Sequence, residues 1–372
     1  MRLLATIILL TANFVAALAL ILASIAGYIS PSTFWPIAFL GLSFPLLVLV
    51  NIAFAILWIA FWKKEAAVSI LALLFSIWHL PKYVAFATPQ TPPNGHRKVR
   101  VMTYNVHLFR QYDSDEATAN EMLDFINAQD ADVICFQEFF TMRDKLSEKD
   151  VKRELGSYPY SFISYTIEKN KREAKFGVAI FSKYPIIKKR KVEFGEESFN
   201  STIYTDLKIG KDTIRLFSSH LESVKLKQTD NPNNIGDRIA NNDIDLPNIK
   251  RIARKLRKAY IKRAAQVDTI RKVIDRTKHP IIFCGDFNDL PGSYTYNTVK
   301  GDLSDAFTRA GRGFTTTYKG LLPTMRIDFV FSDPKITPYR YRSPKSSYSD
   351  HYPVIVDFYI SRKGLKNTSL EE

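Results

Sequence analysis

The stretch "PIIFCGDFN", residues 280–288, decides the fold class of this chain. An apolar run of strand length ends in residues of a different kind, Gly285, Asp286 and Asn288. Because glycine has no Cβ, another backbone can approach closely at Gly285. A strand that is apolar on both faces must be covered on both sides. This is typical of layered α/β proteins and not of a one-faced antiparallel sheet.

The same pattern recurs between residues 99 and 362. Helix-like runs cover residues 115–129 and roughly 247–276. Strand-like runs outnumber them and include "VRVMTYNV", "DVICFQEF", "GVAIFSKYPI", "STIYTDLKI", "TIRLFSSHL", "RIDFVF" and "YPVIVDF". We therefore predict that this part of the chain is an α/β layered sandwich.

Polar side chains of a few types end or begin these strands. Any one of these residues alone is consistent with the polar end of an ordinary core strand. Taken alone, the adjacent Asp350 and His351 fit such a strand end and a catalytic pair equally well. Buried carboxylates are costly unless they are paired or bind a metal, so a whole set of them indicates a site. The set is Asn105, Gln137, Glu138, His220, Asp286, Asn288, Asp328, Asp350 and His351.

The oxygen-rich side chains in this set suit a hard divalent cation, because Mg²⁺ takes oxygen ligands and keeps several waters. The sequence has no Cys/His cluster at zinc spacing, no G-x-S-x-G elbow and no Walker loop. These absences disfavour a zinc enzyme, a serine hydrolase and a P-loop enzyme.

Six motifs in order carry a resemblance to a known family: "TYNV", "FQE", "SSHL", "GDFND", "RIDFVF" and "SDHYPV". They resemble the endonuclease/exonuclease/phosphatase superfamily over roughly residues 99–360. That superfamily includes deoxyribonuclease-like enzymes, abasic-site endonucleases, neutral sphingomyelinases and inositol-polyphosphate 5-phosphatases. Overall, the chain is similar to the bacterial membrane-tethered members. The resemblance implies a four-layer sandwich of two mixed β-sheets flanked by helices.

The resemblance also implies a metal site. Glu138 would be the principal ligand of Mg²⁺ (or Mn²⁺), Asn105 would lie beside the ion, and Asp350 would face the metal side. The chain departs from abasic-site endonucleases at His107, where those enzymes have an aspartate two residues after the motif asparagine. Repair of abasic DNA is therefore not indicated.

The remaining roles implied by the resemblance concern the phosphate. Asp286 and Asn288 would position the attacking water and the scissile phosphate, or assist the leaving group. His220 would donate to a phosphate oxygen. His351 would be the general base or a phosphate-contacting imidazole, with Asp328 rather than Asp350 as its orienting acid.

Residues 1–92 differ from the rest of the chain, since Glu65 is their only acid. Apolar blocks cover residues 3–28, 34–62 and 66–87, and the first two exceed the ~20 residues that cross a bilayer. All the tryptophans lie near block ends, as in an interfacial aromatic belt: Trp35, Trp58, Trp62 and Trp78.

We therefore predict an integral membrane protein. Residues 1–87 would be a transmembrane region of about three helices, 88–98 a Pro-rich linker, 99–362 the catalytic domain and 363–372 a tail. A signal peptide is the alternative for the first block, because Arg2 precedes it, but the block is longer than a signal core.

Positive charges predict the orientation of these helices. Arg2, Lys63 and Lys64 should lie on the cytoplasmic side. Three spans then place the catalytic domain on the periplasmic, extracytoplasmic side of a bacterial inner membrane. Two spans would instead place the catalytic domain on the cytoplasmic side.

The charge of the chain is uneven. Its net charge is +15, and residues 225–278 alone hold 15 basic and 6 acidic residues. In the predicted helix 247–276, apolar residues repeat at helical spacing on one face, and the opposite face is basic. This stripe is either a solvated helix face or a patch for phosphate-rich partners, nucleic acid or an anionic membrane surface.

Three functions follow in order of preference. The first is a membrane-anchored, metal-dependent phosphodiesterase of nuclease type. The second is a phospholipid head-group phosphodiesterase or phosphatase, like the sphingomyelinases. The third is a catalytically dead binding protein, which the intact set of catalytic residue types disfavours. The partners expected are a phosphate ester and the lipid bilayer, and the sequence indicates no protein partner. The polar insertion at 226–247 follows His220 and is expected to influence specificity.

Overall fold

The computed structural model describes residues 2–61, 63–88, 90–110, 117–169, 174–195, 200–225, 246–319 and 326–360. The predicted insertion at 226–247 lies outside the described residues except for its last two positions. The predicted tail, 363–372, and Trp62 also lie outside them.

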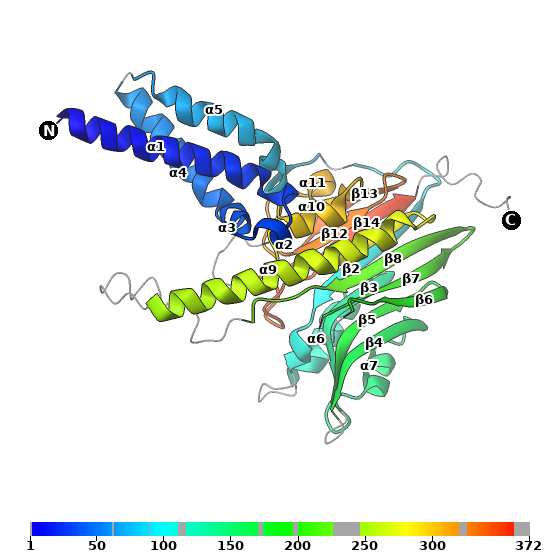
Figure 1. The fold of residues 1–372 in the computed structure, drawn as a ribbon. Coiled ribbons are helices and arrows are strands. Elements are labelled where there is room, and N and C mark those ends of the chain that lie inside the picture. The colour runs from blue at the N-terminus through cyan, green and yellow to red at the C-terminus, as the bar shows by residue number, and fades with distance from the viewer. Residues whose placement is uncertain are drawn as a thin grey trace.

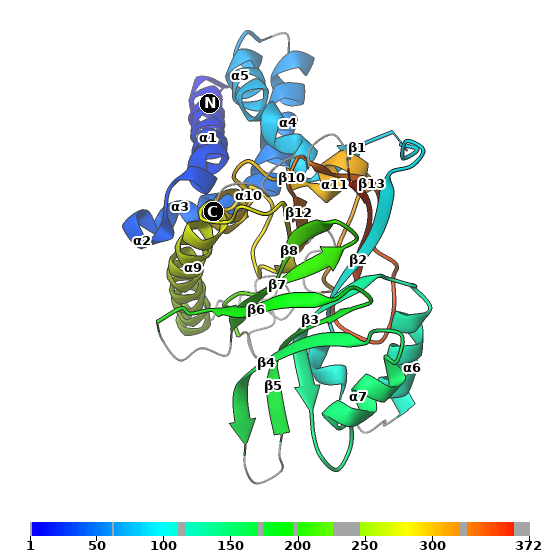
Figure 2. The ribbon, with the colours of Figure 1, turned by 90° about the vertical axis from the view of Figure 1, so that its right-hand side faces the viewer.

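Two six-stranded sheets stack face to face (Figures 1 and 2). The first has the order β13(Ile336–Arg342), β14(Val354–Ile360), β2(Arg97–Asn105), β3(Val133–Thr141), β5(Ala174–Ser182), β4(Tyr160–Lys169). The second has the order β10(Ser304–Asp305), β12(Asp328–Ser332), β9(Ile281–Asp286), β8(Asp212–His220), β7(Ser201–Ile209), β6(Ile186–Val192). A short pair, β1(Val84–Phe86) and β11(Arg312–Phe314), lies apart from both sheets.

Helices cover the outer face of each sheet. α6(Ala117–Asn127) and α7(Glu148–Glu154) pack on the first sheet, while α9(Leu246–Asp275) and α10(Tyr294–Lys300) pack on the second. α11(Ala306–Ala310) follows β10, and a 3₁₀ turn, η3(His107–Arg110), follows β2. The predicted helices at 115–129 and 247–276 correspond to α6 and α9.

Three apolar cores separate the layers. The core between the sheets holds Val101 and Cys135 from one sheet and Leu216 and Cys284 from the other, all buried. The two outer cores join each sheet to its helices. The predicted four-layer sandwich is therefore confirmed.

Each sheet contains one parallel pair, β2–β3 in the first and β8–β9 in the second. In a parallel pair the carboxyl ends of both strands lie at the same edge. The register accordingly places His220 beside Asp286. Gly285 makes this pairing possible: its φ is 148°, and a Cβ there would lie 2.0 Å from the carbonyl oxygen of Ser219. The close approach expected at Gly285 is present.

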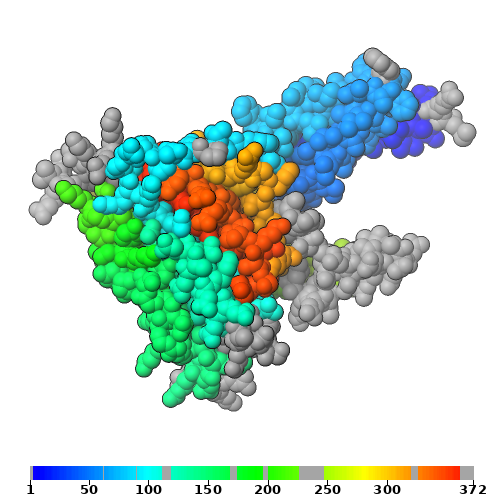
Figure 3. All heavy atoms as spheres, turned by 180° about the vertical axis from the view of Figure 1, so that it is seen from behind, coloured from blue at the N-terminus to red at the C-terminus, as the bar shows by residue number. Residues whose placement is uncertain are grey.

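The N-terminal region forms an arm of helices that projects from the sandwich (Figure 3). Its elements are α1(Arg2–Ile25), η1(Ala26–Tyr28), α2(Pro31–Phe34), α3(Pro36–Leu42), α4(Phe44–Ala60), α5(Ala66–Ser76) and η2(Ile77–Lys82). Leu3–Tyr28 is long and apolar enough to cross a membrane by itself. α3 and α4 meet that criterion only together, across a bend of 64°, and Ala66–Lys82 is shorter.

Buried polar side chains join these apolar helices. Ser69 Oγ donates to Asn13 Oδ1 (2.5 Å), and Asn51 Nδ2 donates to the carbonyl of Ala16 (3.0 Å). The hydroxyls of Ser24 and Ser76 lie 2.8 Å apart. Small and polar contacts of this kind are typical of helices that associate in lipid.

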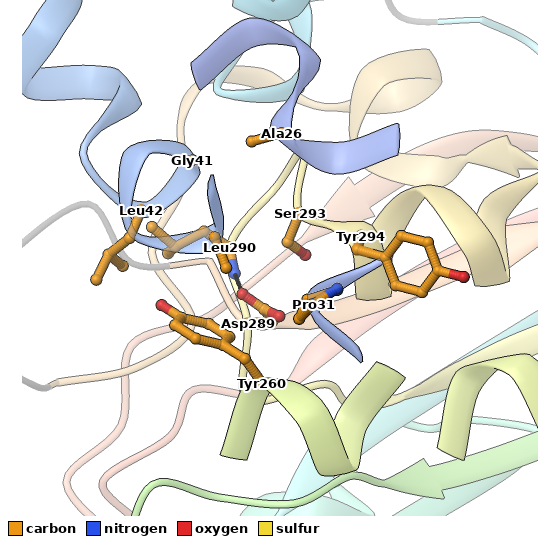
Figure 4. Close-up of a pocket in the computed structure, with 10 residues that line it drawn as sticks. Ala26, Pro31, Gly41, Leu42, Tyr260, Asp289, Leu290, Ser293 and Tyr294 are labelled. Carbon is orange, nitrogen blue, oxygen red and sulfur yellow. Dashed lines mark hydrogen bonds between the residues drawn. The ribbon is translucent and has the colours of Figure 1, made fainter. Parts of the chain in front are cut away.

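The arm also contacts the loop that follows β9. Asn297 Nδ2 donates to the carbonyl of Gly27 (3.0 Å), and Tyr83 Oη donates to the carbonyl of Pro291 (2.5 Å). A Cβ on Gly27 would lie 1.9 Å from the carbonyl oxygen of Gly292, so the two backbones touch. Figure 4 shows Leu290 and Ser293 of this loop and Tyr260 of α9 meeting the residues of α2 and α3 around a pocket of about 20 Å³.

Candidate active site

The side chain of Asn105, the last residue of β2, joins this strand to β3 and β9. Its Nδ2 donates to Glu138 Oε1 (3.2 Å) and to Asp286 Oδ2 (3.0 Å). Its Oδ1 accepts from the backbone N–H of His107 (3.0 Å). Asn105 therefore links a carboxylate of the first sheet to a carboxylate of the second and fixes their separation.

An irregularity in β3 sets the direction of Glu138. The pairing of β3 with β5 shifts between Phe136 and Phe139, and Glu138 has φ of 52°. A bulge re-aims the side chain that it carries, and a left-handed conformation is strained for a residue with a Cβ. Asn288 has the same φ of 52°, and its backbone N–H donates to Asp286 Oδ1 (2.8 Å).

The imidazole of His220 faces these carboxylates without a hydrogen bond. Its Nε2 lies 3.7 Å from Glu138 Oε1 and 3.8 Å from Asp286 Oδ2, too far for hydrogen bonds. The residue is 5% exposed, and neither ring nitrogen has a hydrogen-bond partner among the described residues. Such an orphaned buried donor indicates a place for an oxygen that arrives with a ligand.

His351 and Asp328 form a buried pair. His351 Nδ1 lies 2.9 Å from Asp328 Oδ2, and its Nε2 lies 3.7 Å from Asp286 Oδ2. Asp328 begins β12 directly opposite Asp286, which explains the proximity of the two acids. Burial lowers the pKa of His351, but the charges of Asp328 and Asp286 outweigh it and raise that pKa to about 10. Burial raises the pKa of Asp328 to about 6, against the opposing effect of His351.

Three residues that the sequence did not single out hold this pair. Thr317 Oγ1 accepts from the backbone N–H of Asp328 (3.1 Å), and the ring of Tyr318 lies 4.9 Å from that of His351. Ser349 Oγ donates to the carbonyl of Asn105 (2.8 Å) and accepts from the N–H of His351 (3.1 Å). Ser349 precedes the Asp350–His351 dipeptide, a position that gave some signal, whereas Thr317 gave none.

The predicted site residue Asp350 lies apart from this network. Among the described residues, its side chain makes no hydrogen bond or ion pair with Glu138 or Asp286. Its Oδ1 lies 3.3 Å from His107 Nδ1, and its side chain is 40% exposed. His107 begins η3, where four consecutive residues have positive φ. The position at which the chain departs from abasic-site endonucleases is therefore occupied by a His107–Asp350 pair.

The carboxylates fit a hard divalent cation. Within the described ranges, neither Glu138 nor Asp286 forms an ion pair with lysine or arginine, and the ion-pairing groups closest to them are the imidazoles of His220 and His351. Asp286, Asp328 and His351 also place one donor atom each within 4.8 Å of one another. His351 Nδ1 is engaged by Asp328, however, so that trio is better described as a histidine with its orienting acid.

A four-layer α/β sandwich with these side chains at its strand ends defines the class of hydrolases that act on phosphate esters. The chain belongs to the endonuclease/exonuclease/phosphatase family, whose sequence profile matches residues 102–351. A second profile, for a domain of unknown function (DUF8431), matches residues 6–83. No curated protein matches the chain with significance.

Solved structures of this family share the fold. An endonuclease/exonuclease/phosphatase from Bacteroides vulgatus is 17% identical with a TM-score of 0.52, covering 71% of this chain and 100% of its own. One from Beutenbergia cavernae is 17% identical with a TM-score of 0.51, covering 71% and 72%. The human Nocturnin catalytic domain is 15% identical with a TM-score of 0.50, covering 73% and 100%. At these identities the likeness concerns the fold alone.

Proposed function

We propose that this protein is a membrane-anchored, divalent-metal-dependent phosphodiesterase whose active site is built on Asn105, Glu138, His220, Asp286 and His351. In the reaction, a water oxygen forms a bond to phosphorus while one ester P–O bond breaks. One proton of the water is lost to a base, and the leaving oxygen departs as an alcohol or a stable anion. The family includes enzymes for different phosphate esters, so the site and not the fold must identify the substrate.

The observation that carries this proposal is made within the described residues: the imidazole of His220 has no hydrogen-bond partner, and the two carboxylates beside it have no lysine or arginine partner. A phosphate oxygen would satisfy the imidazole N–H, and a cation would offset the carboxylates. Glu138 and Asp286 would hold the ion, which when bound neutralises phosphate charge and lowers the pKa of a bound water. Asn105 presents its amide nitrogen to both carboxylates, so its role is to position them.

His351 Nε2 lies 3.7 Å from Asp286 Oδ2, and the reacting groups would meet beside these two atoms. Asp328 fixes the imidazole of His351 so that Nε2 points at this position. In the metal-free protein, the raised pKa of His351 favours the imidazolium form, which donates to a phosphate oxygen. The alternative role of general base needs the neutral imidazole. Asn288 holds Asp286 through its backbone N–H.

The membrane anchor is supported by where apolar surface is exposed. Most of the large apolar side chains that are exposed among the described residues lie on the N-terminal helices, such as Leu4, Ile8, Leu49, Ile56 and Leu71. Soluble proteins rarely expose a patch of this extent, whereas lipid tails would cover it.

Hydrolysis of a generic diester tests the activity. The purified full chain in detergent should cleave bis-p-nitrophenyl phosphate in the presence of Mg²⁺ or Mn²⁺. The double variant Asp286→Asn/His351→Ala, prepared in the same way, should be inactive because it lacks both groups at the reacting position. Equal rates for the wild type and the double variant would reject the proposal. Supercoiled plasmid, RNA and lipid vesicles in parallel would compare the nuclease and phospholipid alternatives.

A further inference from the structure

An apolar pocket opens directly beside the proposed catalytic residues. Its volume is about 290 Å³, and Glu138 and His220 form part of its wall. Much of the rest of the wall is made by apolar side chains: Leu108, Phe140, Ile167, Ala174 and Phe176. The pocket is therefore continuous with the proposed phosphate position and has the size of a small-ligand site.

The register of three strands builds this apolar wall. Phe140 of β3 lies opposite Phe176 of β5, and Phe176 in turn lies opposite Ile167 of β4. Phe140 follows Glu138 on the same strand, just beyond the bulge, and both side chains line the pocket. Glu138 and the apolar row are thus fixed relative to each other by one sheet, whose strands β3, β5 and β4 are adjacent (Figure 1).

These side chains are not part of the cores that hold the layers together. Phe140 and Ala174 are buried in a separate cluster, against which Leu108 and Phe176 pack. The ring of Phe176 lies 6.4 Å from that of His220. Contact between these partly exposed apolar groups and water is unfavourable, so a ligand that covers them binds more tightly.

We infer that this pocket binds an apolar ester group of the substrate, so that the enzyme acts on phosphodiesters carrying an alkyl or acyl chain, as a phospholipid does. The inference rests on the proposed function and specifies its substrate class. Among the described residues, the charged lining of the pocket consists of Glu138 and Lys225. A nucleic-acid strand instead needs a basic groove that follows successive phosphates. The exposed apolar surface of the N-terminal helices would also keep the site close to lipid.

Three p-nitrophenyl diesters with the same leaving group test this inference. The methyl, octyl and thymidine-5′ esters all lose p-nitrophenolate through cleavage of the P–O(aryl) bond. Covering several methylene groups should raise kcat/KM for the octyl ester at least tenfold over the methyl ester in the full chain, because each buried methylene contributes roughly 0.8 kcal/mol and about 1.4 kcal/mol is tenfold.

Substitutions in the apolar wall test whether the pocket causes the preference for the octyl ester. Phe176→Ser and, separately, Ile167→Ser should reduce the octyl-to-methyl ratio to below threefold, and Phe176→Leu should retain most of it. Ile187→Ser is the matched control, since Ile187 is 60% exposed on β6 and does not line the pocket. Partition of the octyl ester into detergent is the same for every variant and cancels in the comparison.

The outcomes separate the inference from the function on which it rests. Equal kcat/KM for the octyl and methyl esters, or an octyl preference that survives both serine variants, would overturn the inference and leave the phosphodiesterase intact. Preference for the thymidine ester would overturn it in favour of a nucleobase. Failure to cleave any ester above the Asp286→Asn/His351→Ala background would reject the proposed function, and the inference with it.

Discussion

His220 illustrates at the scale of one residue how function opposes stability in this site. Its imidazole is buried among Glu138 and Asp286 without a hydrogen bond, which costs the folded state roughly 1–3 kcal/mol. His351 is buried to the same extent but is paired with Asp328. The two histidines should therefore respond in opposite ways to substitution.

We predict that His220→Leu leaves the melting temperature unchanged or higher, because an apolar group of similar size replaces an unpartnered polar one. The same change should lower kcat about 10²–10³-fold, the usual effect of removing one donor to a reacting oxygen. His351→Leu is the control and should lower the stability, since it leaves Asp328 buried and unpaired. Thermal unfolding and steady-state kinetics measure both effects, and a large loss of stability in His220→Leu would contradict this assignment.

A second prediction concerns the protonation of His351. Burial lowers the pKa of His351, and the charges of Asp328, Asp286 and Asp350 raise it, so removing one of these charges in Asp328→Asn should lower the pKa from its wild-type value. The wild-type residue should stay protonated between pH 6 and 8 in the metal-free protein. NMR of selectively labelled histidines measures this titration in the wild type and in Asp328→Asn. A wild-type titration near 6.5 would show that the pair does not exist in solution.

Among the structural elements, the parallel pair β8–β9 has a tight geometric requirement at Gly285. Gly285 lies against the backbone of Ser219 and has positive φ, so it combines close approach with a conformation that favours glycine. The two strands end at His220 and Asp286, and any change in their separation moves both side chains.

Gly285→Ala should therefore destabilise the protein by about 3 kcal/mol and reduce activity, because the new methyl group displaces β8. Gly195→Ala is the matched control: φ is +79° there, but nothing lies within 4 Å of the added Cβ, so only the cost of the backbone conformation, about 1 kcal/mol, is expected. Thermal unfolding compares the two variants. Equal losses would mean that close approach is not the constraint.

The elements also show what the sequence could and could not predict. The strands carrying the motifs were predictable, because each is a buried apolar run with a polar residue at or beside one end. The meeting of His220 with Asp286 follows from parallel pairing, and that of Asp328 with Asp286 from antiparallel pairing. The positive φ of Glu138 and the bulge in β3 were not, because they depend on pairing with β5. Thr317 acts through the backbone of Asp328, eleven residues away, so no local pattern marks it. The bend between α3 and α4 occurs within one continuous apolar block.

At the scale of the whole molecule, the N-terminal helices are joined to the catalytic domain near the site. Pro291 and Gly292, which contact Tyr83 and Gly27, are only a few residues beyond Asn288. Arg263 of α9 holds the same loop through Asp289, with Nε 3.3 Å from Oδ2. The arm therefore supports the loop that carries Asp286 and Asn288, in addition to any role as an anchor.

We predict that the catalytic domain lies outside the cytoplasm. Lys63 and Lys64 follow α4 and should stay on the cytoplasmic side together with Arg2, so that α5 and η2 lead the chain back across the membrane. A reporter that works only outside the cytoplasm should be active when it is fused after Glu372 in a bacterial host. The same reporter fused after Lys64 is the control and should be inactive. An inactive full-length fusion, with the protein present at the normal level, would contradict three passages.

The dependence of hydrolysis on Mg²⁺ tests the central claim most directly, because it links a named carboxylate to the chemistry. The full chain should lose its activity on bis-p-nitrophenyl phosphate in EDTA and regain it as Mg²⁺ is added back. Glu138→Gln should need at least tenfold more Mg²⁺ for half of its maximal rate, since it removes one charged ligand. Activity that survives EDTA, or a Glu138→Gln variant with the wild-type Mg²⁺ requirement, would contradict the account.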